Sequence, residues 1–254
     1  MRGKRKGEKN KKIIIVGIII TFALLTSLPY YLKLIENHTN KIKPITNFNF
    51  TSSNTTYIKL YIPAVDAHGD GVLTLLKVFV TPGEGRTLVD IDQLLFWIDT
   101  QQSIQLAKKV AQEITNVDLS KYDIVYTIEE INATIIEGPS AGAALVIATV
   151  AAIQGKELRN DVMITGTINP DGSIGQVGGI LAKAKAAKEA GAKIFLVPKG
   201  QGTQVNYVPK EECEKINYFT FCRITYKREV VNVGEFVGIK IIEVSNIREA
   251  LKYF

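Results

Sequence analysis

Residues 162–198 read VMITGTINPDGSIGQVGGILAKAKAAKEAGAKIFLVP, and this stretch predicts a strand, a turn, a helix and a second strand. The β-branched run at its start predicts a strand that ends at the turn NPDG. Residues 179–190 predict a helix that ends at Gly191, because glycine readily adopts the left-handed conformation that terminates helices. KIFLVP predicts the second strand. Strands and helices are thus interleaved, which favours an α/β or α+β class.

The interleaving continues on both sides of this stretch and predicts one folded domain at residues 56–254. The domain follows a polar linker, residues 33–55, rich in Asn, Thr and Ser. Alternating and helical apolar patterns then predict the remaining elements. We expect strands at 57–65, 71–80, 122–129, 223–232 and 236–244, helices at 92–115, 139–154 and 246–253, and a mixed segment at 207–222.

The N-terminal residues predict a membrane anchor. Residues 1–12 hold seven basic side chains and one acidic side chain, which accounts for the whole net charge of +6. Residues 13–32 are uncharged, and twenty helical residues span ~30 Å, the thickness of a bilayer core. The basic tail predicts a cytoplasmic N-terminus, a retained transmembrane signal anchor at 13–32 and a domain on the outer side. A cleaved signal peptide remains the alternative.

The composition excludes several classes of protein. A nucleic-acid-binding domain carries its positive charge on its folded surface, whereas residues 13–254 are neutral, so we expect no nucleic-acid partner. No His, Cys, Asp or Glu cluster has metal-ligand spacing, and no P-loop motif occurs, so we expect no metal, no cofactor and no ATPase within these residues. Cys213 and Cys222 either form a disulfide in an oxidising compartment or remain buried thiols.

Ser140 lies in EGPSAG, residues 137–142, directly before an apolar run. Pro139 suits a first helical position, so Ser140 is either a first-turn residue or a nucleophile at a helix start. A nucleophilic serine needs a base, and neither His38 nor His68 has a suitable setting. Lysine is the usual alternative, and it must lie among apolar residues that lower its pKa. Lys183 has such neighbours, whereas Lys185 and Lys188 are interpreted as a solvated face.

These motifs resemble those of the proteolytic domain of Lon, a family of Ser-Lys peptidases. EGPSAG resembles the family's nucleophile motif, and residues 165–198 resemble the segment that carries the catalytic lysine, placed at Lys183 by GG-x3-K. The two residues are 43 positions apart, as in typical members. FVTPGEGRTLVDI and DTQQSIQLAKKVAQEI resemble the family's upstream hairpin turn and helix. The resemblance covers residues 57–200 well and 236–253 loosely, and 201–235 are interpreted as an insertion.

The resemblance implies a compact α/β (α+β) domain related to ribosomal protein S5 domain 2-like folds. It implies that Ser140 is the nucleophile and Lys183 the base, that Thr165 holds the lysine, and that Glu137 shapes the site. Thr167 replaces an acidic residue often found in the family, which puts the site's regulation in doubt. The expected protein is a membrane-anchored, ATP-independent serine endopeptidase that acts on unfolded or extended proteins and forms a homo-oligomer, such as a hexamer. The alternatives are a non-catalytic Lon-like assembly module and a subunit that depends on a separate unfoldase.

Overall fold

The computed structural model describes residues 55–90, 98–130, 138–216 and 218–254. The predicted tail, membrane span and nearly all of the linker lie outside these residues, as does Glu137. Within the described ranges, no helix is both long and apolar enough to cross a membrane. Phe50–Phe254 form one compact unit, and its mixture of strands and helices confirms the predicted mixed α/β class.

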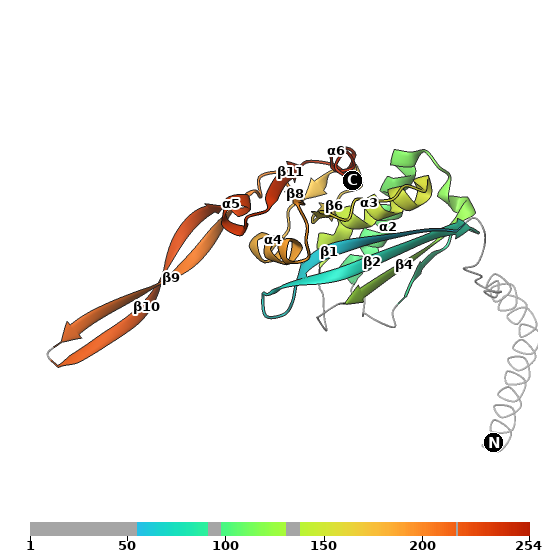
Figure 1. The fold of residues 1–254 in the computed structure, drawn as a ribbon. Coiled ribbons are helices and arrows are strands. Elements are labelled where there is room, and N and C mark those ends of the chain that lie inside the picture. The colour runs from blue at the N-terminus through green and yellow to red at the C-terminus, as the bar shows by residue number, and fades with distance from the viewer. Residues whose placement is uncertain (1–54, 91–97, 131–137, 217) are drawn as a thin grey trace, which may run out of the picture. The chain divides into compact units, whose positions relative to one another are not determined.

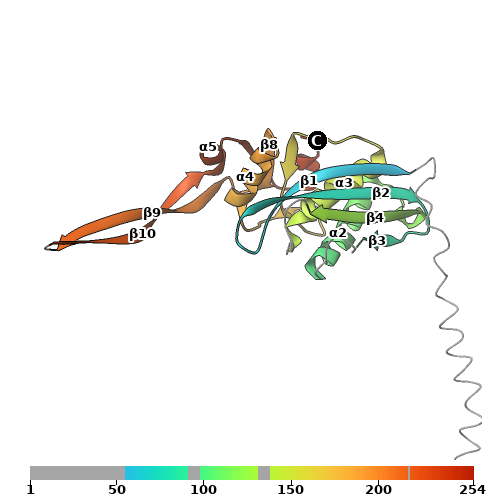
Figure 2. The same cartoon turned by 60° about the horizontal axis from the view of Figure 1, so that its bottom comes forward.

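A four-stranded sheet forms one layer of the domain (Figures 1 and 2). Its order is β1 (Thr56–Val65), β2 (Gly71–Pro82), β4 (Tyr122–Glu130) and β3 (Thr87–Val89). The β1–β2 and β2–β4 pairs are antiparallel, and β3 runs parallel to β4. The strands predicted at 57–65 and 71–80 are confirmed as β1 and β2, which form an antiparallel hairpin. Strand β3, only three residues long, was not predicted, since so short a run carries no period.

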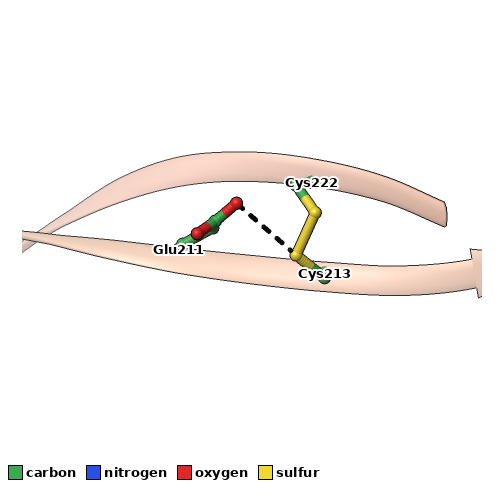
Figure 3. A group of neighbouring side chains, drawn as sticks. All are labelled: Glu211, Cys213 and Cys222. Atoms are coloured by element: carbon green, nitrogen blue, oxygen red, sulfur yellow. Dashed lines mark hydrogen bonds between the residues drawn. A yellow bond between two sulfur atoms is a disulfide. The ribbon is translucent and has the colours of Figure 1, made fainter.

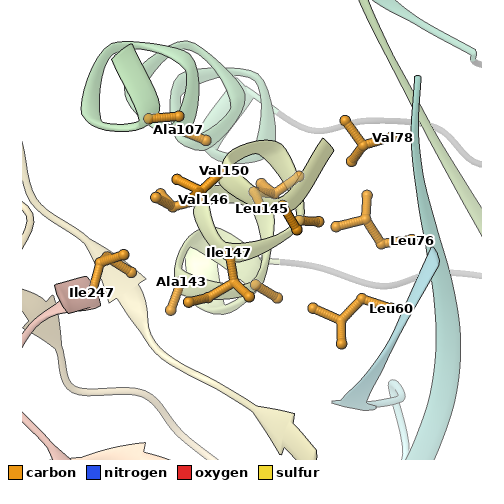
Figure 4. Packing of buried hydrophobic residues seen from close by; sticks show 14 of the residues in the cluster. Leu60, Leu76, Val78, Ala107, Ala143, Leu145, Val146, Ile147, Val150 and Ile247 are labelled. Carbon is orange, nitrogen blue, oxygen red and sulfur yellow. The ribbon is translucent and has the colours of Figure 1, made fainter. Parts of the chain in front are cut away.

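Two helices lie on one side of this sheet, and α3 (Gly142–Gln154) packs directly against it. Helix α2 (Ile98–Thr115) is followed by a 3₁₀ turn, η1 (Leu119–Lys121), and α3 lies between α2 and the sheet (Figure 4). Leu60 and Leu76 face α3 from the sheet, and Ala107 faces it from α2. Every residue of α3 from Gly142 to Ala152 is buried. A helix surrounded on all sides is apolar on all sides, which explains the uniform composition of this segment.

A smaller parallel sheet follows, with the order β11 (Lys240–Val244), β8 (Ile194–Pro198) and β5 (Val162–Ile164). Helix α4 (Ile180–Glu189) contacts β8 and also β1 and β2 of the larger sheet. The close approach is visible at Gly71, where an added Cβ would lie 2.1 Å from the Ala182 carbonyl oxygen. The helix that carries Lys183 is therefore held against both sheets.

The strand predicted at 162–168 is divided in two. It ends as β5 at Ile164 and resumes as β6 (Thr167–Ile168), which pairs with β7 (Ile174–Gly175) across the NPDG turn. Gly166 lies at the break with φ 156°, and an added Cβ there would lie 2.4 Å from Ile174 Cγ2. The apolar run therefore turns where only glycine leaves room for the packed Ile174 side chain.

The C-terminal predictions need three corrections. The mixed segment at 207–222 belongs to a long antiparallel ribbon of β9 (Thr203–Ile216) and β10 (Phe219–Asn232), hereafter the arm. The strand predicted at 236–244 begins instead as helix α5 (Val233–Val237), because the Asn232 side chain accepts the Glu235 N–H and caps a helix start. The last helix, α6 (Ile247–Ala250), is shorter than the predicted 246–253.

Candidate active site

Ser140 lies in a single 3₁₀ turn, η2 (Pro139–Ala141), that leads directly into α3. The sequence predicted an α-helix from residue 139, so the α-helix begins three residues later than expected. The turn is fastened to the break between β5 and β6: the Gly166 N–H donates to the Ser140 carbonyl at 2.9 Å, and the Ala143 N–H donates to the Gly166 carbonyl at 3.0 Å. The Ser140 side chain stays partly exposed.

Gly142 allows this close approach. An added Cβ would lie 2.7 Å from Ile168 Cγ2 and 2.8 Å from the Ile168 nitrogen. A backbone atom cannot move aside as a side chain does, so a larger residue at position 142 would push η2 away from β6. The glycine of EGPSAG that follows Ser140 by two residues is therefore explained by packing.

Lys183 lies on the buried face of α4, together with Ile180, Ala184 and Ala187. Only 3% of Lys183 is exposed. Burial disfavours the charged ammonium and lowers the pKa of Lys183 to about 8. Lys185 and Lys188 are exposed, as the sequence predicted.

Thr165 lies between Ser140 and Lys183. The Lys183 Nζ donates to the Thr165 hydroxyl at 3.4 Å, and that hydroxyl donates to the Ser140 carbonyl oxygen at 3.3 Å. A hydroxyl has one donor hydrogen and two acceptor lone pairs, so it can make both contacts. Both distances are long for hydrogen bonds, which makes the contacts weak. Thr165 is fully buried and is held in place by its N–H, which donates to the Leu196 carbonyl.

Ser140 and Lys183 line the same pocket, whose volume is about 490 Å³. Its other walls come from the end of β1, at Val65 and Asp66, and from the segment between β7 and α4 that includes Val177. Among the described residues, the hydrogen bond of Lys183 Nζ reaches Thr165 and not the Ser140 hydroxyl. The serine and the lysine therefore share a cavity and are linked through Thr165.

Gln201 supports one wall of this pocket and was not found by sequence reasoning. Its side-chain amide oxygen accepts the Val177 N–H at 3.0 Å, and its amide nitrogen donates to the Val177 carbonyl at 2.7 Å. Gln201 is 8% exposed. Val65, Asp66 and Val177 were missed too. No local pattern indicates them, because they approach Ser140 only through the packing of β1 and α4.

Of the four predicted site residues, the structure brings together Ser140, Thr165 and Lys183. Glu137 lies outside the described residues, so its part in the site stays a prediction. The catalytic roles of the other three stay predictions as well, although their positions suit a nucleophile, a base and a residue that holds the base.

Glu211, Cys213 and Cys222 form a cluster with the side-chain types of a metal site, but its chemistry is that of a disulfide. Cys213 and Cys222 are joined, as Figure 3 shows, and therefore offer no thiolate to a metal. The Cys213 sulfur lies 3.7 Å from the Glu211 carboxylate. A disulfide sulfur carries no hydrogen, so this approach is only a contact. The sequence left open a disulfide or two buried thiols, and the structure contains the disulfide.

Residues 97–233 match the model of the Lon protease (S16) C-terminal proteolytic domain, which is more than half of the chain. The chain belongs to the Lon proteolytic-domain family. The match extends to residue 233 and thus over the arm, so the interpretation of residues 201–235 as an insertion stays a prediction.

Curated Lon proteases from several organisms are similar to the chain. The Lon protease of Methylocella silvestris is 32% identical over 161 residues, which cover 63% of this chain and 18% of that protein. Lon protease 2 of Thermus thermophilus is 29% identical, over 68% of this chain and 21% of its own length. The archaeal Lon protease of Thermococcus kodakarensis is 27% identical, over 61% of this chain and 24% of its own length. The chain thus spans about a fifth of the length of these relatives.

Proposed function

We propose that the chain is a serine endopeptidase that uses Ser140 as nucleophile and Lys183 as general base. One observation carries the proposal: a buried lysine with a lowered pKa lines the same pocket as a partly exposed serine in the family's motif. A lysine works as a base only when a substantial fraction is neutral near the working pH. A pKa of about 8 meets this condition, whereas that of an exposed lysine does not.

In the proposed mechanism, neutral Lys183 accepts the proton of the Ser140 hydroxyl as the hydroxyl oxygen attacks the peptide carbonyl carbon. The resulting ammonium of Lys183 then gives this proton to the amine of the departing peptide, and an acyl-Ser140 ester remains. Lys183 next takes a proton from a water molecule, which attacks the ester. The proton returns to Ser140 as the acid product leaves, so atoms and charge balance over the cycle.

Thr165 acts in this mechanism as a positioning residue. Its hydroxyl holds the Lys183 Nζ, and its own donor is occupied by the Ser140 carbonyl. For proton transfer the Nζ must approach the Ser140 hydroxyl, and the long contact to Thr165 costs little to weaken. Glu137, directly before the nucleophile motif, is proposed to shape the same site.

The oxyanion of the tetrahedral intermediate needs backbone N–H donors near Ser140. The Gly142 N–H donates to the Pro139 carbonyl, and the Ala143 N–H donates to the Gly166 carbonyl. Neither can also bind the oxyanion without rearrangement. We therefore place the proposed oxyanion hole at N–H groups that precede Gly142 in the chain.

The proposed substrates are unfolded or extended proteins, and the proposed reaction needs no ATP. The 254 residues contain no P-loop motif, so hydrolysis by this chain alone would proceed without nucleotide. Hydrolysis without nucleotide would favour segments that are already extended. A homo-oligomer, for example a hexamer, is proposed from the family resemblance.

The proposed location is the cell membrane, with the N-terminus in the cytoplasm and the catalytic domain outside. The uncharged stretch at 13–32 behind seven basic residues supports a single-pass anchor. The Cys213–Cys222 disulfide supports an oxidising compartment for the domain. A topology reporter fused after Phe254 tests this: activity of the reporter in the cytoplasm contradicts the proposed orientation.

The test of the activity uses the full chain and fluorogenic casein, first without ATP and then with it. We expect cleavage by the unchanged protein and by Lys185→Ala, whose lysine is exposed on the same helix. We expect the loss of at least 10³-fold in rate for Ser140→Ala and for Lys183→Ala, because each removes one partner of the proton transfer. Activity that survives in either variant contradicts the dyad. Absence of cleavage by all four proteins, with and without ATP, favours the non-catalytic module.

A further inference from the structure

The arm carries most of the exposed large hydrophobic side chains in the part of the chain that the structure describes. Of twelve such side chains, ten lie between Val205 and Val230, and the other two are Tyr57 and Phe236. The arm extends away from the α/β body in both views (Figures 1 and 2). Exposed apolar side chains gathered in one place mark interaction surfaces.

Strand pairing divides the arm into two faces of different chemistry. Successive side chains of a strand point to opposite faces, and directly opposite residues share a face. One face, the apolar face, contains the Cys213–Cys222 disulfide and side chains that are between 38% and 71% exposed. These side chains are Val205, Tyr207, Ile224, Tyr226 and Val230.

The other face, the polar face, carries the ion pairs of the arm. Arg223 lies 3.2 Å and Lys210 lies 3.3 Å from the Glu212 carboxylate, and Lys227 lies 3.1 Å from Glu229. Three exposed apolar side chains, Ile216, Phe219 and Phe221, also lie on this face, next to the turn at the tip of the arm, and Val208 lies on it nearer the root. The polar face is therefore suited to water over most of its length, and the apolar face is not.

The two strands of the arm are joined near the tip and anchored at the root, and the apolar face between these ends is exposed to solvent. A two-stranded hairpin alone is only marginally stable in water. The disulfide joins its strands near the tip, and at the root the Glu243 carboxylate accepts the N–H groups of Gly200 and Gly202 at 3.0 and 2.7 Å. The apolar face between these ends remains exposed and would be stabilised by a partner that covers it.

A second arm matches this face better than the body of a second copy does. The body offers only Tyr57 and Phe236 as large exposed hydrophobic side chains in its described residues. An aromatic side chain offers ~150–250 Å² and Val and Ile offer less, so the five partly exposed side chains offer on the order of 500 Å² per arm. Two apolar faces packed together would bury about 1,000 Å², the lower limit for a specific interface.

The charges on the apolar face are arranged for a pair related by a two-fold axis. Between the disulfide and the root, this face has two charged residues, Glu211 and Arg228. Pro209 and Tyr226 form the central pair of the face, with Glu211 one pair toward the tip and Arg228 one pair toward the root. When two arms pack face to face in opposite directions about this centre, each Glu211 comes to the level of Arg228 of the second copy. A negative and a positive side chain are then brought to the same level on both sides of the two-fold axis.

We propose that the chain associates with a second copy through the apolar faces of the two arms, packed in opposite directions about Tyr226. The two-fold axis places Tyr226 against its equivalent in the second copy. The proposal concerns assembly and does not depend on the proposed protease activity.

Cross-linking tests this geometry directly. Tyr226→Cys places a thiol at the centre of the proposed interface, and Thr225→Cys places one on the adjacent polar face. The full-length variants are treated with a short bismaleimide, which reacts with thiols and leaves the disulfide intact. We expect a covalent dimer for Tyr226→Cys and at least tenfold less for Thr225→Cys. Equal cross-linking of the two variants, or none in either, overturns the proposal.

The mass of the full-length protein gives a second test, measured by light scattering with the detergent contribution subtracted. Ile224→Glu puts a charge on the apolar face, and we expect it to reduce the mass of the assembly by a factor of two. Thr225→Glu should leave the mass unchanged. If the arm instead bound substrate polypeptide, Ile224→Glu would weaken casein binding and leave the mass unchanged, and this result also overturns the proposal.

Discussion

The Lys183 Nζ lies 3.4 Å from the Thr165 hydroxyl, and both residues are buried. The hydroxyl also contacts the backbone of Ser140, so a residue of the smaller sheet region links the lysine of α4 to the serine that precedes α3. The properties of this link, and of the glycine and glutamine that support it, lead to five predictions.

The rate of peptide hydrolysis should rise with pH until about 8 and then level off. The pKa of Lys183 is lowered to about 8 by burial, and only the neutral amine accepts the serine proton. Below that pH, kcat/KM should fall about tenfold per pH unit, because the neutral fraction falls by that factor. A rate–pH profile with a peptide that has no titratable groups measures this. A flat profile between pH 6 and 8 contradicts a lysine base.

Thr165→Val should lower kcat and move the midpoint of this profile to lower pH. The hydroxyl accepts a hydrogen bond from Lys183 and thereby stabilises its ammonium form, so its removal lowers the pKa of Lys183 further. Thr165→Ser keeps the hydroxyl and should keep the midpoint of the unchanged protein. If the valine and serine variants have the same midpoint, the hydroxyl does not set the pKa of the lysine.

Lys183→Met should stabilise the folded protein at pH 7 while it abolishes activity. The pKa of Lys183 in the folded protein is about 8, against an ordinary value of 10.5. Between these values the unfolded chain binds more protons, so the cost of burying the charge is complete below pH 8 and vanishes as the pH rises toward 10.5. The shift corresponds to at most ~3 kcal/mol.

Chemical denaturation of the Lys183→Met variant at pH 7 and at pH 10.5 measures this gain. Lys109→Met, which replaces an exposed lysine of α2, serves as the control and should change stability little at either pH. An equal stability change from Lys183→Met at both pH values would show that packing, and not charge burial, is responsible.

Gly142→Ala should destabilise the protein and reduce activity, although alanine favours helices by about 1 kcal/mol. The added Cβ would lie 2.8 Å from the Ile168 nitrogen and would displace the Ser140 turn. We expect a loss of ~1–3 kcal/mol in the free energy of unfolding. Gly178→Ala is the control, because that glycine lines the pocket of Ser140 and Lys183 and an added Cβ there meets nothing within 4 Å. Equal stabilities of the two variants would show that β6 moves away from the added Cβ at little cost in free energy.

Gln201→Leu should raise KM more than it lowers kcat. Its side chain makes two hydrogen bonds with the backbone of Val177, which forms a wall of the pocket and takes no part in proton transfer. Loss of these bonds should cost ~1–2 kcal/mol of stability. Gln105→Leu, at an exposed position of α2, is the control for the change in side-chain chemistry. A fall in kcat with an unchanged KM would contradict a role in forming the wall.

Long periodic segments of this domain could be predicted from the sequence, and short ones could not. Strands β1, β2 and β4 and helix α3 alternate or cluster their apolar residues over nine or more positions. Strands β3, β6 and β7 span two or three residues, too few to show a period. The last two residues of helix α5 were predicted as the start of a strand, because the Asn232 cap and Gly238, not apolar spacing, set the ends of this helix.

The sequence by itself determined the serine and lysine candidates, because a motif and a small-residue helix face are local and can be read in order along the chain. It also indicated two cysteines that could pair. Only the tertiary structure decided that Thr165 lies between Ser140 and Lys183, that Gln201 holds the pocket wall, and that the apolar side chains of the arm share one exposed face. These relationships depend on contacts between residues distant in the chain, and on burial, which one segment alone does not specify.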